Sequence, residues 1–141
     1  MRASLPTKKL PRMWWKRKAD APQGVLKQRG AAGERLAARY LFFRGYRIIA
    51  RNLRLGRNEI DLIVRRGDTI AFVEVKTRQR SGAWEPHDAV GETKQRHIKA
   101  AAHAWLAHNE KPGFYYRFDV VSIVMPERGK AQITHLPDAF R

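Results

Sequence analysis

The sequence predicts an α/β fold in which helices pack against a mixed sheet. Apolar residues recur at helical spacing in two segments, and stretches of alternating bulky residues lie between and after them. The resulting order is helix, three strands, helix and two strands, which is typical of a sheet flanked by helices. The chain has 141 residues, of which 43% are hydrophobic, so it is long enough to bury one core.

The first helix is expected over about residues 31–44. Leu36, Tyr40 and Leu41 fall on one helical face, and Gly45 provides a stop. This face is the one that should pack on the sheet.

Three strands are expected after this helix. Residues 47–55 are rich in Ile and Leu, and the segments 58–65 and 69–77 are separated by a tight turn that contains Gly67 and Asp68. Such a turn predicts an antiparallel hairpin.

The rest of the chain repeats the pattern of helix and strand. A loop over about 79–92 leads into a second helix over about 93–108, and strands are expected over 115–124 and 132–136. The buried stripe of the second helix is marked by Ile98, Ala101, Ala102, Trp105 and Leu106.

Residues 1–30 have a different composition from the rest. They hold nine basic side chains and one acid, Asp20, together with three prolines. We interpret them as a basic, flexible N-terminal arm in front of a domain formed by residues 31–141. Trp14 and Trp15 either stack on bases or anchor this arm against the domain.

The composition restricts the compartment and the partners. The formal net charge is +16, and phosphate backbones are the commonest polyanions that meet such a surface, so nucleic acid is the expected partner. A ribosome-associated basic protein is the alternative. The chain has no cysteine, no apolar run that could span a bilayer and no secretory signal, which favours the cytoplasm.

Acidic side chains gather on the predicted hairpin. If Gly67 and Asp68 form its two-residue loop, Asp61 lies directly opposite Glu74, and Glu59 lies directly opposite Lys76. Opposite residues in an antiparallel pair share a face, with their Cβ atoms about 5 Å apart.

Two carboxylates at this separation repel each other by about 3 kcal/mol at an effective dielectric constant near 20. A bound divalent cation removes this repulsion, because carboxylate oxygens are preferred ligands of Mg²⁺. A proton shared between Asp61 and Glu74 is the alternative.

Two more residues belong to this candidate site. Glu34 lies near the helical face that packs on the sheet, so it is either a solvated flank residue or a further ligand. Lys76 follows Glu74 by two positions on the same strand face, where it can orient a water molecule and offset negative charge on a phosphate. A plain surface ion pair is the alternative for Lys76.

Basic residues near the candidate site form a possible phosphate-binding surface. Arg78, Lys94, Arg96 and Lys99 are candidates for nucleic-acid binding, with a solvated helix face as the alternative. Asp119 could support the site, but a structural pair with Arg117 is the favoured interpretation.

Taken together, the motifs resemble those of a known family. Asp61 with Glu74-Val75-Lys76 resembles the PD-(D/E)xK nuclease superfamily, and the fuller pattern is closer to the YraN family of small bacterial proteins, which is similar to archaeal Holliday-junction resolvases. The matching segments are Gly33-Glu34, Gly45-Tyr46, Arg51-Asn52, Asn58-Glu59-Ile60-Asp61-Leu62-Ile63, Phe72-Val73-Glu74-Val75-Lys76-Thr77-Arg78, Lys94-Gln95-Arg96, Arg117-Phe118-Asp119-Val120-Val121, Ile133-Thr134-His135 and Ala139-Phe140.

The resemblance implies a restriction-endonuclease-like αβββαβ core with a Mg²⁺ or Mn²⁺ site. By position, Asp61 and Glu74 would bind the metal, Glu34 would assist, Lys76 would act on the attacking water, and Glu59 would support the ligands. The superfamily's proline before the aspartate is Ile60 here.

The implied function is a metal-dependent endonuclease that hydrolyses phosphodiester bonds in DNA, with branched or repair intermediates as candidate substrates. Cutting both strands symmetrically would favour a homodimer. The alternative is a nucleic-acid-binding protein that keeps the nuclease fold but no longer cuts.

Overall fold

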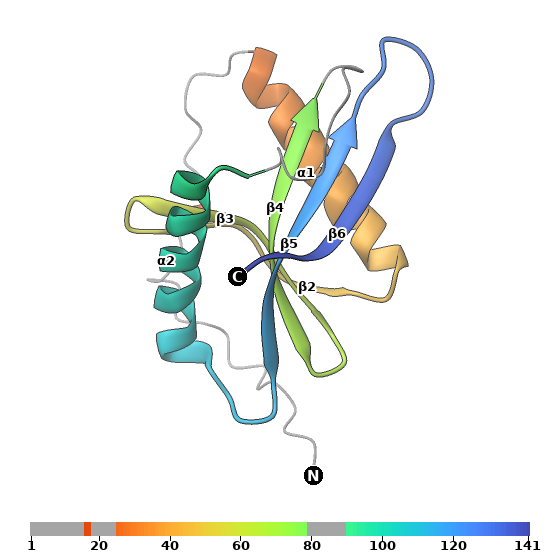
Figure 1. Cartoon of the computed structure of the whole chain (residues 1–141). Coiled ribbons are helices and arrows are strands. Elements are labelled where there is room, and N and C mark those ends of the chain that lie inside the picture. Colours follow the sequence, from red (N-terminus) through yellow and green to blue (C-terminus); the bar gives the residue numbers. More distant parts are fainter. Residues whose placement is uncertain (1–15, 18–24, 79–89) are drawn as a thin grey trace.

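The computed structural model describes residues 16–17, 25–78 and 90–141 (Figure 1). Trp14, Trp15 and most of the predicted loop 79–92 lie outside the described residues. The elements in chain order are β1 (Lys16–Arg17), α1 (Val25–Phe43), β2 (Arg47–Leu55), β3 (Asn58–Arg66), β4 (Thr69–Arg78), α2 (Glu92–Asn109), β5 (Tyr115–Val124) and β6 (Gln132–Phe140).

All strands belong to one mixed sheet with the order β1-β2-β3-β4-β5-β6. Neighbouring strands are antiparallel except for β4 and β5, which run parallel because α2 carries the chain back between them (Figure 1). The predicted α/β class is confirmed, and the order from α1 to β5 matches the expected αβββαβ core. Neither helix in the described part of the chain combines the length and apolar character needed to cross a bilayer.

The two helices cover opposite faces of the sheet. On one face, Ala37 and Leu41 of α1 pack against Leu62, Val73 and other residues of the central strands. On the other face, Trp105 of α2 packs against Phe72, with 5.7 Å between the ring centroids. Alternation along β4 therefore assigns its odd-numbered residues to the α1 face and its even-numbered residues to the α2 face.

Apart from shifts of one residue, the boundaries of the predicted elements differ from the prediction in two places. Helix α1 begins at Val25 rather than near residue 31, so it reaches into the predicted arm, because a short run of good helix formers precedes Gly30. Strand β6 continues to Phe140 rather than ending near residue 136, since an edge strand tolerates Pro137. The expected bounds of β2 and β5 are confirmed.

The hairpin of β3 and β4 has the predicted register. The ladder runs from Leu62 opposite Val73 to Arg66 opposite Thr69. Gly67 has a φ of +59°, a conformation that glycine adopts without steric cost. The ladder ends where Leu62 lies opposite Val73. The next residues are Asp61 and Glu74, which we call the acidic pair, so the two strands are no longer paired at the candidate site.

Gly33 lets α1 approach β4 closely. A Cβ atom at this position would lie 1.9 Å from Thr77 Oγ1 and 3.1 Å from Thr77 Cβ, so rotation of the threonine alone cannot relieve the clash. We expect Gly33→Ala to lower the free energy of unfolding by about 1–3 kcal/mol, as overpacking does elsewhere. Urea denaturation of the purified variants measures this change.

Gly30 provides the matched control on the same helix. A Cβ atom there meets nothing within 4 Å, so Gly30→Ala should stabilise the protein by about 0.5–1 kcal/mol. Equal effects of the two substitutions would contradict a close contact between α1 and β4.

Candidate metal centre where two strands separate

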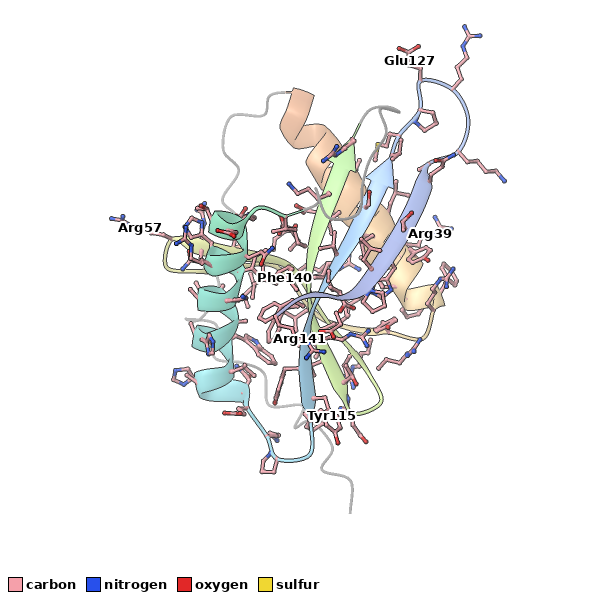
Figure 2. The ribbon with its side chains drawn as sticks, in the orientation of Figure 1. Arg39, Arg57, Tyr115, Glu127, Phe140 and Arg141 are labelled. Atoms are coloured by element: carbon pink, nitrogen blue, oxygen red, sulfur yellow. The ribbon has the colours of Figure 1, made fainter. Side chains whose placement is uncertain are left out.

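Strand β3 leaves β4 at Asp61. Asn58, Glu59 and Ile60 pair only with β2, and the hairpin of β2 and β3 bends toward α2, where Ile60 joins the cluster around Trp105. The turn of this hairpin lies beside α2, with Arg57 at its tip (Figure 2). Because of this bend, the backbone N–H of Val75 in β4 has no backbone partner on β3.

The side chain of Asp61 accepts a hydrogen bond from this N–H group. The Val75 N–H donates a hydrogen bond of 2.8 Å to Asp61 Oδ2. This bond fixes the carboxyl group in the split between the strands, and Asp61 is only 7% exposed.

The strand separation also corrects one prediction. The ladder between β3 and β4 ends at Leu62 opposite Val73, so it contains neither expected pair, that is, neither Asp61 with Glu74 nor Glu59 with Lys76. The prediction extended the hairpin ladder beyond Leu62, whereas the packing of Ile60 under α2 draws β3 away.

Glu74 lies next to Asp61 on the α2 face of the sheet. It is 6% exposed, and Lys94 Nζ of α2 lies 3.7 Å from its Oε1. Its Oε2 is buried and has no hydrogen-bond partner among the described residues. A buried carboxyl oxygen without a partner is costly, and either a bound ligand or a proton shared with Asp61 would account for it.

The surroundings of Glu74 raise its pKa to about 8. Burial is the largest cause, and the charge of Asp61 and a hydrogen bond with it raise the pKa further, whereas Lys94 and Lys76 lower it. Glu74 therefore holds a proton at neutral pH.

The pair of carboxyl groups fits a divalent metal ion of the Mg²⁺ type. Such an ion needs only one or two carboxylates from the protein and fills its other positions with water and phosphate oxygens. Within residues 16–17, 25–78 and 90–141, no group of three or more His, Asp or Glu side chains is arranged to hold a metal. Glu34 extends from α1 next to Gly33, which meets Thr77 of β4, and its role as an assisting ligand stays a prediction.

The family of the chain follows from comparison with known sequences. Residues 33–123 match the protein family described as uncharacterised protein family UPF0102. The chain belongs to the UPF0102 family. The expected membership of the YraN family is thereby confirmed, since both names denote the same family.

Relatives in several organisms are similar to this chain over most of their length. A UPF0102 protein of Chlorobaculum tepidum is 43% identical over 126 residues, which is 86% of this chain and 95% of the relative. UPF0102 proteins of Nocardia farcinica and Rhodococcus opacus are each 47% identical over 111 residues, which is 79% of this chain and 87% and 94% of the relatives. The matched segment contains both Asp61 and Glu74.

The predicted phosphate-binding residues of this UPF0102 chain do not all lie together. Lys94 contacts Glu74 directly, so it belongs to the acidic pair as well as to the helix surface. Arg78 is exposed at the end of β4, and Arg96 is exposed on α2 and donates to Thr93 Oγ1. Lys99 Nζ lies 5.9 Å above the Phe140 ring, toward β6.

The expected pair of Arg117 and Asp119 is confirmed and belongs to a larger network. Asp119 is fully buried and accepts hydrogen bonds from Arg117, from His135 Nε2 at 2.8 Å and from the Asp138 N–H at 2.9 Å. Arg117 also donates to the Tyr46 hydroxyl. Asp119 lies on the α1 face, so this network is separated by the sheet from Glu74. His135 lies in one of the segments that carry the family resemblance, but no role was predicted for it.

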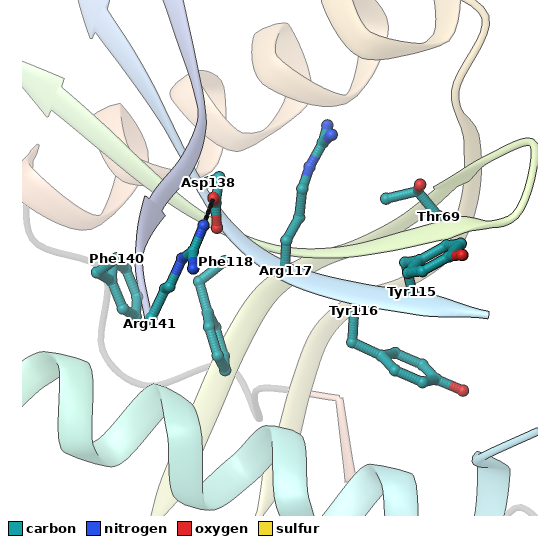
Figure 3. Close-up of a pocket in the computed structure, with 8 residues that line it drawn as sticks. All are labelled: Thr69, Tyr115, Tyr116, Arg117, Phe118, Asp138, Phe140 and Arg141. Atoms are coloured by element: carbon teal, nitrogen blue, oxygen red, sulfur yellow. Dashed lines mark hydrogen bonds and ion pairs between the residues drawn. The ribbon is translucent and has the colours of Figure 1, made fainter.

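A hollow of about 560 Å³ opens at the start of β5 (Figure 3). It is lined by Thr69, Tyr115, Tyr116, Arg117, Phe118, Asp138, Phe140 and Arg141. Arg141 is tied to Asp138 by an ion pair of 3.0 Å (Figure 3). Neither Asp61 nor Glu74 lines this hollow, so it is distinct from the acidic pair.

The raised pKa of Glu74 predicts a pH dependence of stability in metal-free buffer. A carboxyl group whose folded pKa is raised from 4.5 to about 8 adds its full stabilisation to the free energy of unfolding below pH 4.5. This stabilisation is lost as the pH rises toward 8. The melting temperature of the wild type should therefore fall by several degrees over this window relative to Glu74→Gln, which cannot ionise. Parallel pH profiles for the two proteins in scanning calorimetry would refute the assignment.

Proposed function

We propose that this protein is a metal-dependent endonuclease that hydrolyses phosphodiester bonds in DNA. The observation that supports it most is the buried pair of Asp61 and Glu74, whose carboxyl groups meet where β3 leaves β4. Two adjoining buried acids are costly in a fold that serves only as a scaffold, even where Glu74 holds a proton and hydrogen-bonds to Asp61.

Asp61 and Glu74 would hold Mg²⁺ or Mn²⁺, which when bound polarises a phosphate and lowers the pKa of water. The Val75 N–H keeps the Asp61 carboxyl oriented for this task without any rearrangement. Preorganisation of this kind is what distinguishes a ligand from a surface acid.

Lys76 would act on the attacking water, and Lys94 would act on the charge of the phosphate. Both cations are close enough to act on the pKa of Glu74. In the proposed reaction, a water oxygen forms the new bond to phosphorus and gives up one proton to bulk solvent. The bond from phosphorus to one sugar oxygen breaks, and this leaving oxygen takes up a proton from solvent to become a hydroxyl group. Lys76 would orient this water, and Lys94 would offset the negative charge of the phosphate oxygens.

The basic surface supports nucleic acid as the substrate. The net charge of +16 attracts a phosphate backbone. Exposed Arg78 lies on β4, which carries Glu74, and exposed Arg96 lies on α2, which carries Lys94. Branched DNA or repair intermediates are the candidate substrates, and a homodimer would place two such centres on opposite strands.

One observation favours a second candidate, a nucleic-acid-binding protein that does not cut. Lys94 Nζ already lies beside Glu74, so an ammonium group can neutralise the acidic pair in place of a metal ion. Binding without hydrolysis would then be the whole function.

A cleavage assay separates the two candidates. Wild type, Asp61→Ala and Lys76→Ala are incubated with branched, single-stranded and linear DNA in Mg²⁺ or Mn²⁺, with and without EDTA. Arg128→Ala, an exposed residue on the loop between β5 and β6, is the control for general loss of positive charge.

We expect wild type and Arg128→Ala to cut only when metal is present, and Asp61→Ala to be inactive. Cleavage that survives Asp61→Ala would mean that a contaminant is cutting. Binding of DNA without any cleavage by the wild type would establish the second candidate instead.

A further inference from the structure

A basic and aromatic surface lies at the C-terminal end of α1, on the opposite face of the sheet from Glu74. It consists of Arg39, Tyr40, Phe42, Phe43 and Arg44, which we call the α1 aromatic patch. Phe42 and Phe43 are 63% and 73% exposed, and their rings meet edge to face with centroids 5.7 Å apart. Figure 2 places Arg39 on the side of the molecule away from α2.

The patch surrounds a shallow hollow of about 450 Å³. Leu36 of α1 and Ile133 of β6 line it together with Arg39, Tyr40, Phe43 and Arg44, and none of these residues is acidic. The Arg44 guanidinium lies 4.5 Å above the Tyr40 ring, and that of Arg39 lies 5.8 Å from the Phe43 ring. These contacts hold both arginine heads beside aromatic rings at the surface.

We propose that the α1 aromatic patch binds the unpaired nucleotides of single-stranded nucleic acid. Exposed aromatic rings stack on bases of any sequence, and neighbouring arginines follow the phosphates. A duplex offers only phosphates here, because its bases are stacked inside. The proposal takes its partner class from the proposed function but does not require cleavage.

Charge argues against a second copy of the chain as the occupant. A twofold interface brings the same surface of each copy together, so Arg39 and Arg44 would meet their own counterparts with no acid from the patch between them. Like charges brought together in this way oppose association. Single-stranded nucleic acid is an acidic polymer with flat apolar bases, so it is attracted to Arg39 and Arg44 rather than repelled by them.

The patch lies on the other face of the sheet from the acidic pair, so it would bind a strand other than the one being cut. A substrate with an unpaired tail would then be held at two places, which raises its affinity over that of a plain duplex. The proposal thus narrows the substrate of the proposed nuclease to DNA with single-stranded segments.

The test measures binding in EDTA, so that no cleavage occurs. Fluorescence anisotropy is recorded with a labelled oligothymidylate about 20 nucleotides long and with a duplex of the same length. The variants are Phe43→Ala and Arg39→Ala. Tyr115→Ala is the matched control for the aromatic ring, since Tyr115 is 74% exposed at the start of β5, and Arg128→Ala is the control for charge.

We expect Phe43→Ala to weaken oligothymidylate binding about tenfold and duplex binding less than about twofold. Arg39→Ala should reduce the slope of log affinity against log salt by about 0.7. The two control variants should bind oligothymidylate as the wild type does. Since Phe43 is largely exposed, thermal melting should be unchanged.

Wild-type affinity of Phe43→Ala for oligothymidylate would overturn the proposal, and so would an equal loss in Tyr115→Ala. A wild-type dimer in sedimentation that Phe43→Ala dissociates would make a second copy the occupant and would also overturn it. Asp61→Ala should bind oligothymidylate normally. An absence of cleavage with intact, Phe43-dependent binding would therefore remove the nuclease proposal alone.

Discussion

Asp119→Ala is expected to lower the free energy of unfolding by about 3–5 kcal/mol, which is the usual cost of removing one partner from a buried ion pair. The Asp119 carboxylate is fully buried and accepts hydrogen bonds from Arg117, His135 and the Asp138 N–H. Its removal leaves these donors without an acceptor and breaks the hydrogen bonds through which Asp119 links β5 to β6. Urea denaturation at neutral pH measures the change.

The control for Asp119 is the exposed ion pair between Asp138 and Arg141. Asp138→Asn removes a surface pair of 3.0 Å but keeps the backbone N–H that donates to Asp119, so it should cost less than about 1 kcal/mol. A loss of less than 1 kcal/mol in Asp119→Ala would show that the network does not stabilise the fold.

The same network predicts how stability changes in acid. Burial raises the pKa of Asp119, but the hydrogen bonds from His135, the Asp138 N–H and Arg117 outweigh it and hold the pKa below its usual 3.8. A lowered pKa means that the stabilisation is present above pH 3.8 and is lost as the pH falls through the folded pKa. Asp119→Asn should lack this component of the acid transition.

Lys76→Ala is expected to reduce the cleavage rate about 10²- to 10³-fold if the proposed nuclease activity is present. Lys76 shares a strand face with Glu74 and is close enough to lower its pKa, so its ammonium group is placed to act at the same phosphate. The loss should appear in kcat, because the interaction matters most when charge develops on the phosphate. Single-turnover cleavage of branched DNA in Mn²⁺ measures it.

Arg78 is the control on the same strand. It is exposed at the end of β4, so Arg78→Ala should weaken substrate binding and raise KM while leaving kcat nearly unchanged. A Lys76→Ala variant that retained wild-type kcat would exclude Lys76 from the chemistry.

The register of the central hairpin could be predicted from sequence because its causes are local. Gly67 and Asp68 define the turn, and the alternation of residues fixes which positions face each other up to Leu62. The separation of β3 from β4 could not be predicted in this way. It depends on Ile60 packing under Trp105, which is more than 40 positions away in the chain.

Two contacts of the candidate site have the same non-local origin. The approach of Lys94 to Glu74 depends on how α2 crosses the sheet, which helical spacing does not reveal. The placement of Glu34 depends on how closely α1 approaches β4, and Gly33 allows this close approach next to Thr77. The acidic pair and Lys76 were therefore predictable from the strand pattern, but the contact of Lys94 with Glu74 was not.

The central claim is that Asp61 and Glu74 together bind a divalent metal ion, and calorimetric titration with Mn²⁺ tests it most directly. We predict that the wild type binds about one Mn²⁺ and that affinity rises with pH up to about 8, with release of a proton, because Glu74 must lose its proton to bind. Asp61→Asn and Glu74→Gln should abolish binding, whereas Glu34→Gln should retain it. Unchanged Mn²⁺ affinity in Glu74→Gln, or no binding by the wild type at pH 8, would contradict the claim.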